Sequence, residues 1–153
     1  MRFDLSGESH GEWFRFFKSE VKENGEIVYA EPENGAGRVC IRLGDPKTIG
    51  DIQAKTRVKK SEFVVNPTDR KMERVVYYDQ TDEQARKEQE LVWDYAIQEW
   101  EGILDKNGND VPCTAENKLK LMGIPVFARF VHRCLRMMVS ANAAQGEIEG
   151  KNL

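Results

Sequence analysis

Apolar residues in the first half of the chain occur in short runs separated by residues that favour turns. The runs are rich in β-branched and aromatic side chains, which favour strands, and Gly, Pro and Asn lie between them. This pattern predicts strands at residues 13–17, 26–30, 38–43, 62–65 and 74–78.

Two of the intervening segments have the composition of hairpin turns. Asn24 and Gly25 tolerate the positive φ angles that a tight loop requires, so we expect a hairpin between Phe14 and Tyr29. The Asn-Pro-Thr-Asp sequence at residues 66–69 lies between two apolar runs and predicts a second hairpin. The charged segment 51–60 is compatible with either a short exposed helix or a charged edge strand.

Helical signals dominate after residue 80. Thr81 and Gln84 have the spacing of a capping box, in which Thr81 accepts from the backbone amide of Gln84 and Gln84 reaches back. The apolar pattern that follows predicts a helix to about Ile103, with Trp93 and Trp100 as core anchors.

Turn residues divide the remainder into two further helices. Asn107-Gly108 and Pro112 end the first helix, and Thr114 caps a short second helix. The third begins near Pro125, because apolar residues recur there at intervals of three and four. Residues after Gln145 are expected to fray.

These elements predict an α+β protein, with an N-terminal antiparallel β-sheet made of hairpins followed by a C-terminal three-helix segment. We expect a β-rich subdomain at residues 1–80, a helical subdomain at 81–145 and a flexible tail at 146–153. Because 153 residues is a common size for one domain, the subdomains are expected to form one compact domain.

Composition narrows the classes of partner. The net charge of −3, with basic and acidic residues balanced along the chain, disfavours nucleic acid as a partner. No signal-like leader and no apolar run of about 18 residues occur, so we expect a protein inside the cell without membrane association. The spacing of Cys40, Cys113 and Cys134 fits neither a disulfide framework nor a zinc site, and reduced thiols are expected.

Candidate chemistry is sparse. The segment from Asp105 to Glu116 has part of the ligand spacing of a calcium loop, but Asp110 and Pro112 occupy its sixth and eighth places. The histidines, His10 and His132, accompany no nucleophile pattern, and Cys134 reads as a core residue. We therefore predict no catalytic, cofactor-binding or metal-binding residues and no enzymatic activity.

Two groups of side chains are candidates for protein interaction. Large rings on both faces of the first predicted strand either pack in the core or remain partly exposed for self-association or for an apolar client. Basic residues of the last helix form a stripe that is either a solvated face or a site for an acidic partner or phosphate. The candidates are Trp13, Phe14, Phe16 and Phe17 on the strand, and Arg129, Arg133, Arg136 and the neighbouring Met137 on the helix.

Several sequence motifs support a resemblance to a known family. W-x-G-I occurs at residues 100–103, V-P-C-T-x-E-N-K at 111–118 and P-V-F-x-R-F at 125–130. With the preceding charged helix they resemble, mainly over residues 81–140, tail assembly chaperones of long-tailed bacteriophages. The earlier motifs at 25–29 and 65–68 are similar in layout to the β-rich leader of some proteins of that group.

The resemblance implies a phage or prophage tail assembly chaperone that binds the tape-measure protein in the cytoplasm of the bacterial host during tail morphogenesis. It implies a non-enzymatic protein without a cofactor, with self-association as a further possibility. The alternative is a structural virion component, such as a head-tail joining or tail-completion protein. A more remote alternative is a calcium-dependent binding module.

Overall fold

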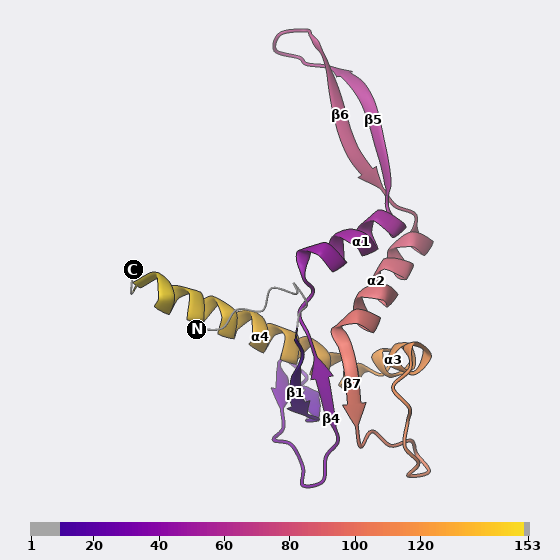
Figure 1. Cartoon of the computed structure of the whole chain (residues 1–153), viewed down its shortest axis with the longest axis vertical. Coiled ribbons are helices and arrows are strands. Elements are labelled where there is room, and N and C mark those ends of the chain that lie inside the picture. The colour runs from indigo at the N-terminus through magenta and orange to yellow at the C-terminus, as the bar shows by residue number, and fades with distance from the viewer. Residues whose placement is uncertain (1–9, 152–153) are drawn as a thin grey trace. The chain divides into compact units, whose positions relative to one another are not determined.

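The computed structural model describes residues 10–151, and within this range the chain has both helices and antiparallel sheets (Figure 1). The α+β prediction is therefore confirmed, with four helices in the described part of the chain. In chain order the elements are β1 (Glu12–Arg15), β2 (Ser19–Val21), β3 (Ile27–Tyr29), β4 (Arg38–Ile41), α1 (Pro46–Thr56), β5 (Val58–Val65), β6 (Met72–Asp79), α2 (Asp82–Ala96), β7 (Ile97–Glu101), α3 (Ala115–Met122) and α4 (Pro125–Lys151).

The chain divides into two compact units. Of the described residues, 10–45 and 93–151 form one, which we call the core unit, and 46–92 form the other, which we call the inserted unit. This division differs from the boundary expected at residue 80, because the N-terminal strands pack with the C-terminal helices.

The core unit is built on a three-stranded antiparallel sheet of order β1-β4-β7. Its central strand β4 buries Val39 and Ile41 completely, and side chains of α4 cover them. Burial of an apolar side chain of this size contributes about 1.5–3 kcal/mol. The buried cluster comprises Val39, Ile41, Ile97, Trp100, Met122, Phe127, Phe130, Val131, Cys134 and Met138.

The first predicted helix was too long, because residues 97–101 form strand β7. Ile97 and Trp100 are both buried, and their spacing of three residues is also typical of a helix. The spacing has another cause here: the β4–β7 register shifts between Cys40 and Ile41, so β7 has one extra residue at this point. The bulge thus gives a strand a helix-like pattern of buried positions.

The first predicted hairpin also has different strands. β1 pairs with β4, whereas β2 pairs with β3 around a turn at which Gly25 has φ 85°. The Asn24 side chain accepts a hydrogen bond from the amide of Glu26 at 3.0 Å, as expected for this turn. The segment between β1 and β2 instead carries aromatic rings into the core.

Two of the predicted helix starts are confirmed by their hydrogen bonds. The Thr81 hydroxyl accepts from the amide of Gln84 at 3.1 Å, and the Gln84 side chain accepts from the amide of Thr81 at 2.9 Å. Thr114 caps α3 by accepting from the amide of Asn117 at 3.2 Å. At the other end, α4 continues to Lys151, and residues 152–153 lie outside the described range; the fraying expected after Gln145 stays a prediction.

The inserted unit consists of α1, the β5–β6 hairpin and the first eleven residues of α2. The ambiguous segment 51–60 contains both predicted states, because α1 ends at Thr56 and β5 begins at Val58. The second hairpin is confirmed, with eight-residue strands in continuous antiparallel register. Arg57, which follows α1 directly, pairs with Glu88 in the middle of α2.

Candidate interaction surfaces

The aromatic candidates of the N-terminal segment differ in exposure. Trp13 is 39% exposed, and the Arg38 guanidinium lies 4.4 Å from its ring centroid. Phe16 and Phe17 are half-buried, with ring centroids 5.1 Å and 4.9 Å from that of Phe130. Phe14 is also half-buried and packs against the core, so Trp13 is the ring most open to a partner.

The basic stripe of α4 contacts the β2–β3 hairpin. Arg129 donates to the Ser19 hydroxyl at 2.7 Å and to the Ser19 carbonyl at 3.2 Å. Arg136 donates to the Tyr29 hydroxyl at 2.9 Å, and the Arg133 guanidinium lies 4.9 Å from the Tyr29 ring centroid. These contacts give the arginines a role in holding the hairpin on α4; a role in binding a partner stays a prediction.

Of the other α4 candidates, Met137 is half-buried against the core. Met138, Phe127 and Phe130 are buried in the core itself, with 7%, 4% and 1% exposure. These three residues belong to the packed core, and of them only Phe127 also lines a hollow of the surface.

That hollow is an apolar groove of about 230 Å³ in the core unit. At its rim, Leu104 is 56% exposed and Ile124 is 47% exposed. The sequence analysis identified Phe16 as a candidate but missed the rest of the lining, because its residues come together from four segments. The groove is lined by Phe16, Gly37, Gly102, Ile103, Leu104, Leu121, Ile124, Val126 and Phe127.

The W-x-G-I motif has a structural explanation beside this groove. Trp100 donates its ring N–H to the carbonyl of Val111 at 2.6 Å. Gly102 has φ 68° and its backbone lies against Gly37, where an added Cβ would be 2.5 Å from the Gly102 carbonyl oxygen. The motif therefore fixes a close backbone approach within the core unit.

The Asp105–Glu116 segment forms a polar turn. The Asp105 carboxylate accepts from the amides of Asn107 and Asn109 at 2.8 Å and 3.0 Å. Glu116 lies on α3 and pairs with Lys120 at 3.0 Å. Among residues 10–142, whose side chains the structure describes, no three or more His, Cys, Asp or Glu side chains are grouped as a metal ion would require.

The thiols are those of packed side chains. Cys134 is fully buried, and desolvation raises its pKa to about 12. Burial also raises the pKa of Cys113 and of Cys40. A nucleophilic cysteine requires the opposite shift, so none of the three thiols is activated.

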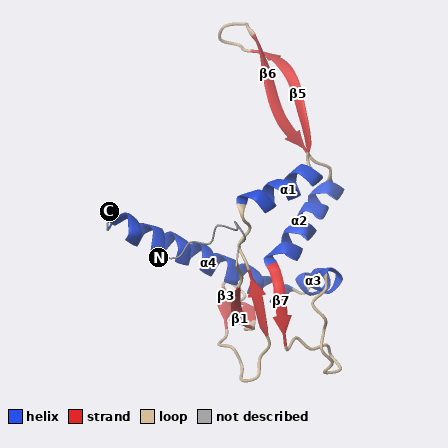
Figure 2. Cartoon of the chain, in the orientation of Figure 1, coloured by secondary structure: helices blue, strands red, loops and turns tan. Residues whose placement is uncertain are grey.

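Among the described residues, most of the exposed large apolar side chains belong to the β5–β6 hairpin. Every residue of both strands is exposed. Figure 2 shows the two strands extending past the ends of α1 and α2, so that helices of the inserted unit reach the ribbon only at its base. A two-stranded ribbon alone is marginally stable in water, so contact with a partner would stabilise it. Exposed apolar surface of this kind is typical of a binding site.

Strand alternation and the observed register give the hairpin two different faces. One face has two basic residues and no acidic residue; we call it the cationic face. Its apolar side chains are 46–68% exposed. The cationic face comprises Lys59, Ser61, Phe63, Val65, Met72, Arg74, Val76 and Tyr78.

The opposite face, which we call the anionic face, has three acidic residues and one basic residue. Lys60 donates to Asp79 at 2.7 Å, which leaves Glu62 and Glu73 without a cation of the ribbon within ion-pair distance. Its apolar side chains are 38–47% exposed. The anionic face comprises Val58, Lys60, Glu62, Val64, Glu73, Val75, Tyr77 and Asp79.

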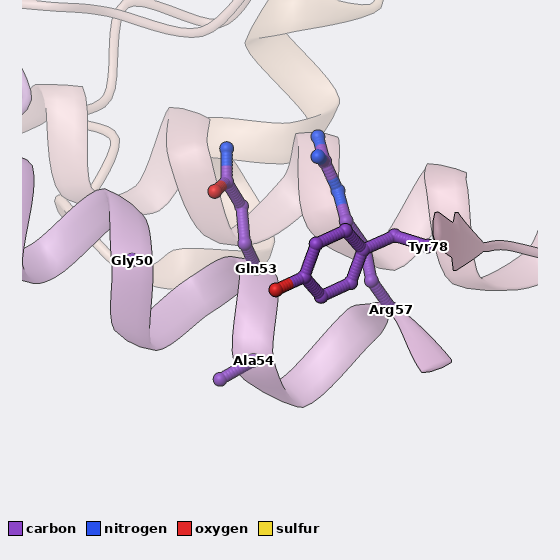
Figure 3. A pocket seen from close by; sticks show the side chains of 5 residues that line it. All are labelled: Gly50, Gln53, Ala54, Arg57 and Tyr78. Atoms are coloured by element: carbon purple, nitrogen blue, oxygen red, sulfur yellow. The ribbon is translucent and has the colours of Figure 1, made fainter. Parts of the chain in front are cut away.

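A pocket of about 300 Å³ lies where the cationic face meets α1. Figure 3 shows the Tyr78 ring beside the Arg57 side chain, with Gln53, Ala54 and Gly50 of α1 on the pocket wall. Tyr78 is 64% exposed, so the pocket is open to solvent and extends the cationic face toward the helices.

In comparisons with known proteins, no family model, no curated protein and no solved structure matches the chain. Within residues 10–151, every helix is too short or too polar to cross a lipid bilayer.

Proposed function

We propose that this chain is a phage or prophage tail assembly chaperone, a non-enzymatic protein that binds the tape-measure protein during tail morphogenesis. The observation that carries the proposal is the β5–β6 hairpin, which exposes apolar side chains on both faces. Exposed apolar surface of this extent on a folded protein favours a protein partner. The motifs at residues 100–130 supply the family resemblance.

The chemistry of the hairpin suits an elongated helical client. Phe63 and Met72 are 68% and 67% exposed, and their rings and thioethers adapt to varied apolar stripes. Many weak contacts of this kind together keep a client soluble. They dissociate when the client enters the more stable assembly of the phage tail. The apolar groove with Leu104 and Ile124 at its rim offers a second contact on the core unit.

A second candidate is a structural component of the virion. It is favoured by the free outer edges of the hairpin, because β5 and β6 pair with each other and with no further strand of the described chain. Such edges add readily to a neighbouring sheet, as in a ring of subunits. A structural component remains in the finished particle, whereas a chaperone leaves it.

The two candidates are separated by tagging the chain in the cells that produce it. Co-purifying proteins and purified particles are then analysed by quantitative mass spectrometry. Capture of the tape-measure protein, with the chain absent from particles, supports the chaperone. Stoichiometric presence in particles supports the structural component. If the tape-measure protein is not captured and the chain is absent from particles, both candidates are rejected.

A hairpin variant connects this result to the surface. Phe63→Ser with Met72→Ser removes two exposed apolar side chains from the cationic face and is expected to reduce capture of the tape-measure protein at least about tenfold. The matched control is Val21→Ser with Val28→Ser, because these side chains are 55% and 41% exposed on the other hairpin. Equal loss in both variants would contradict a specific role of β5 and β6.

A further inference from the structure

The two faces of the β5–β6 hairpin complement each other. Both are apolar, but the cationic face has Lys59 and Arg74 with no acid, whereas the anionic face has Glu62, Glu73 and Asp79 with one base. We propose that hairpins of successive copies of this chain stack face to face, with the cationic face of one copy on the anionic face of the next.

The positions of the charges along the ribbon fit this arrangement. In the observed register Arg74 is paired with Phe63, one residue pair from Glu62 and one from Glu73. Lys59 is paired with Tyr78, one residue pair from Asp79. Each residue pair advances the ribbon by about 3.4 Å, so two hairpins that stack in the same direction bring Arg74 of one copy within reach of Glu62 and Glu73 of the other. Lys59 lies near Asp79, which already pairs with Lys60 of its own copy, so Arg74 carries most of the charge contact.

Stacking of like faces lacks this complementarity. Two cationic faces would bring Lys59 and Arg74 of both copies into one interface that has no acid, and two anionic faces would enclose Glu62 and Glu73 of both copies beside Lys60, which pairs with Asp79. Like charges enclosed between apolar side chains oppose association, whereas opposite charges favour it and fix the register of an interface. The charge pattern therefore selects the mixed arrangement.

The apolar side chains supply the attraction and the charges supply the selectivity. Phe63, Val65 and Met72 at the far end of the cationic face are each at least 60% exposed. Val64 and Val75 of the anionic face are 38% and 39% exposed. A second ribbon packs at about 10 Å from the first and removes both apolar strips from water.

The two contacting faces are different, so the interface is heterologous. Each added copy leaves one cationic and one anionic face open, and association continues until a ring closes or an open chain forms. We therefore expect assemblies larger than dimers, in which the repeating contact is the hairpin.

The test uses sedimentation velocity of the purified full chain over a range of concentrations. Lys59→Glu with Arg74→Glu makes both faces negative, and Glu62→Lys with Glu73→Lys makes both faces positive. Each variant alone is expected to associate more than about tenfold more weakly than the wild type. An equimolar mixture of the two is expected to associate again, because the negative faces of one variant then meet the positive faces of the other.

Controls separate this contact from general charge effects and from unfolding. Arg86→Glu with Lys87→Glu changes the net charge by the same amount as Lys59→Glu with Arg74→Glu, but at exposed positions of α2. This control is expected to associate as the wild type does. The wild type itself is expected to dissociate as NaCl rises from about 0.05 M to about 0.5 M, since ions screen the paired charges. This measurement requires no variant.

A wild type that stays monomeric at all concentrations overturns the inference. So does association that neither salt nor charge reversal weakens, which would indicate backbone pairing at the strand edges. A mixture of folded variants that stays monomeric also overturns it. The purified chain is used alone, so failure here is distinct from failure to capture a tape-measure protein.

Discussion

The Arg57 guanidinium donates to both carboxylate oxygens of Glu88, at 2.8 Å and 3.2 Å, across the helices that support the β5–β6 hairpin. The Thr56 hydroxyl donates to the same carboxylate at 3.1 Å. The hydrogen bond from Arg57 is the main reason that the pKa of Glu88 is lowered from its ordinary value. The Arg57–Glu88 pair therefore makes the stability of the base of the hairpin depend on pH.

The sign of this coupling follows from the lowered pKa. The stabilisation is present above the ordinary glutamate range and is lost as the pH falls through the folded-state pKa. Protection of α1 and α2 amides from hydrogen exchange, corrected for intrinsic rates, is expected to fall between about pH 5 and about pH 3. In the Glu88→Gln variant, the loss of amide protection at low pH is expected to be smaller than in the wild type.

Asp51→Asn is the control for that titration, because Asp51 is an exposed carboxylate within α1. It is expected to keep the wild-type pH profile. If Glu88→Gln also kept that profile, the Arg57–Glu88 pair would have no measurable role in the stability of the inserted unit.

Packing of Phe130 is expected to dominate the stability of the core unit. Its side chain is 1% exposed and contacts both Phe16 and Phe17 edge to face. Phe130→Ala is expected to lower the free energy of unfolding by about 3–5 kcal/mol. Tryptophan fluorescence during denaturation measures this, since all three tryptophans belong to the core unit.

Val139→Ala on the same helix is the matched control, because Val139 is 55% exposed. We expect a change within about 0.5 kcal/mol. Equal costs for the two truncations would show that α4 does not pack through the Phe130 side as described.

The close approach of Gly37 to Gly102 makes a further prediction. Gly37→Ala brings a Cβ to 2.5 Å from the Gly102 carbonyl oxygen, a backbone atom that cannot move aside locally. We expect a cost of about 1–3 kcal/mol in the free energy of unfolding, from strain and displaced backbone. The same fluorescence measurement applies.

Gly35→Ala serves as the comparison, since Gly35 has φ 76° but nothing within 4 Å of an added Cβ. Its expected cost is the conformational one alone, about 1 kcal/mol. A Gly37→Ala variant no less stable than Gly35→Ala would contradict the close backbone approach.

Cys134 is expected to make the core unit sensitive to alkali. Because burial raises its pKa to about 12, the stability that its neutral thiol gives is present below the ordinary cysteine pKa and is lost as the pH rises toward 12. Thiol labelling of the native protein at pH 8 should therefore modify Cys134 far more slowly than half-buried Cys113. Equal labelling rates would contradict the packed environment of Cys134.

Local sequence signals predicted much of the fold. Thr81 with Gln84 and Thr114 with Asn117 are close in sequence, so their caps follow from local spacing. β7 did not follow, because its pairing with β4 joins residues about sixty positions apart, and the bulge imitates a helical pattern. Tertiary pairing thus overrode a locally plausible helix.

The candidate surfaces were less accessible to sequence reasoning. Arg129 reads as part of a solvated or ligand-binding stripe, but its partner Ser19 lies 110 residues away. The second hairpin was predicted, but a run such as Phe63-Val64-Val65 reads equally as a buried strand. Whether other elements cover an apolar strand depends on tertiary structure, and here every residue of β5 and β6 is exposed.

Hydrogen exchange of the chain, at a concentration where it is monomeric, with and without the tape-measure protein would show most directly whether the hairpin is the binding surface, because stacked copies would cover the same faces. We expect complex formation to slow exchange in β5 and β6, because a docked client shields the open edges and faces of the ribbon from solvent. Unchanged exchange throughout residues 58–79 in a complex that does form would contradict the proposed binding surface.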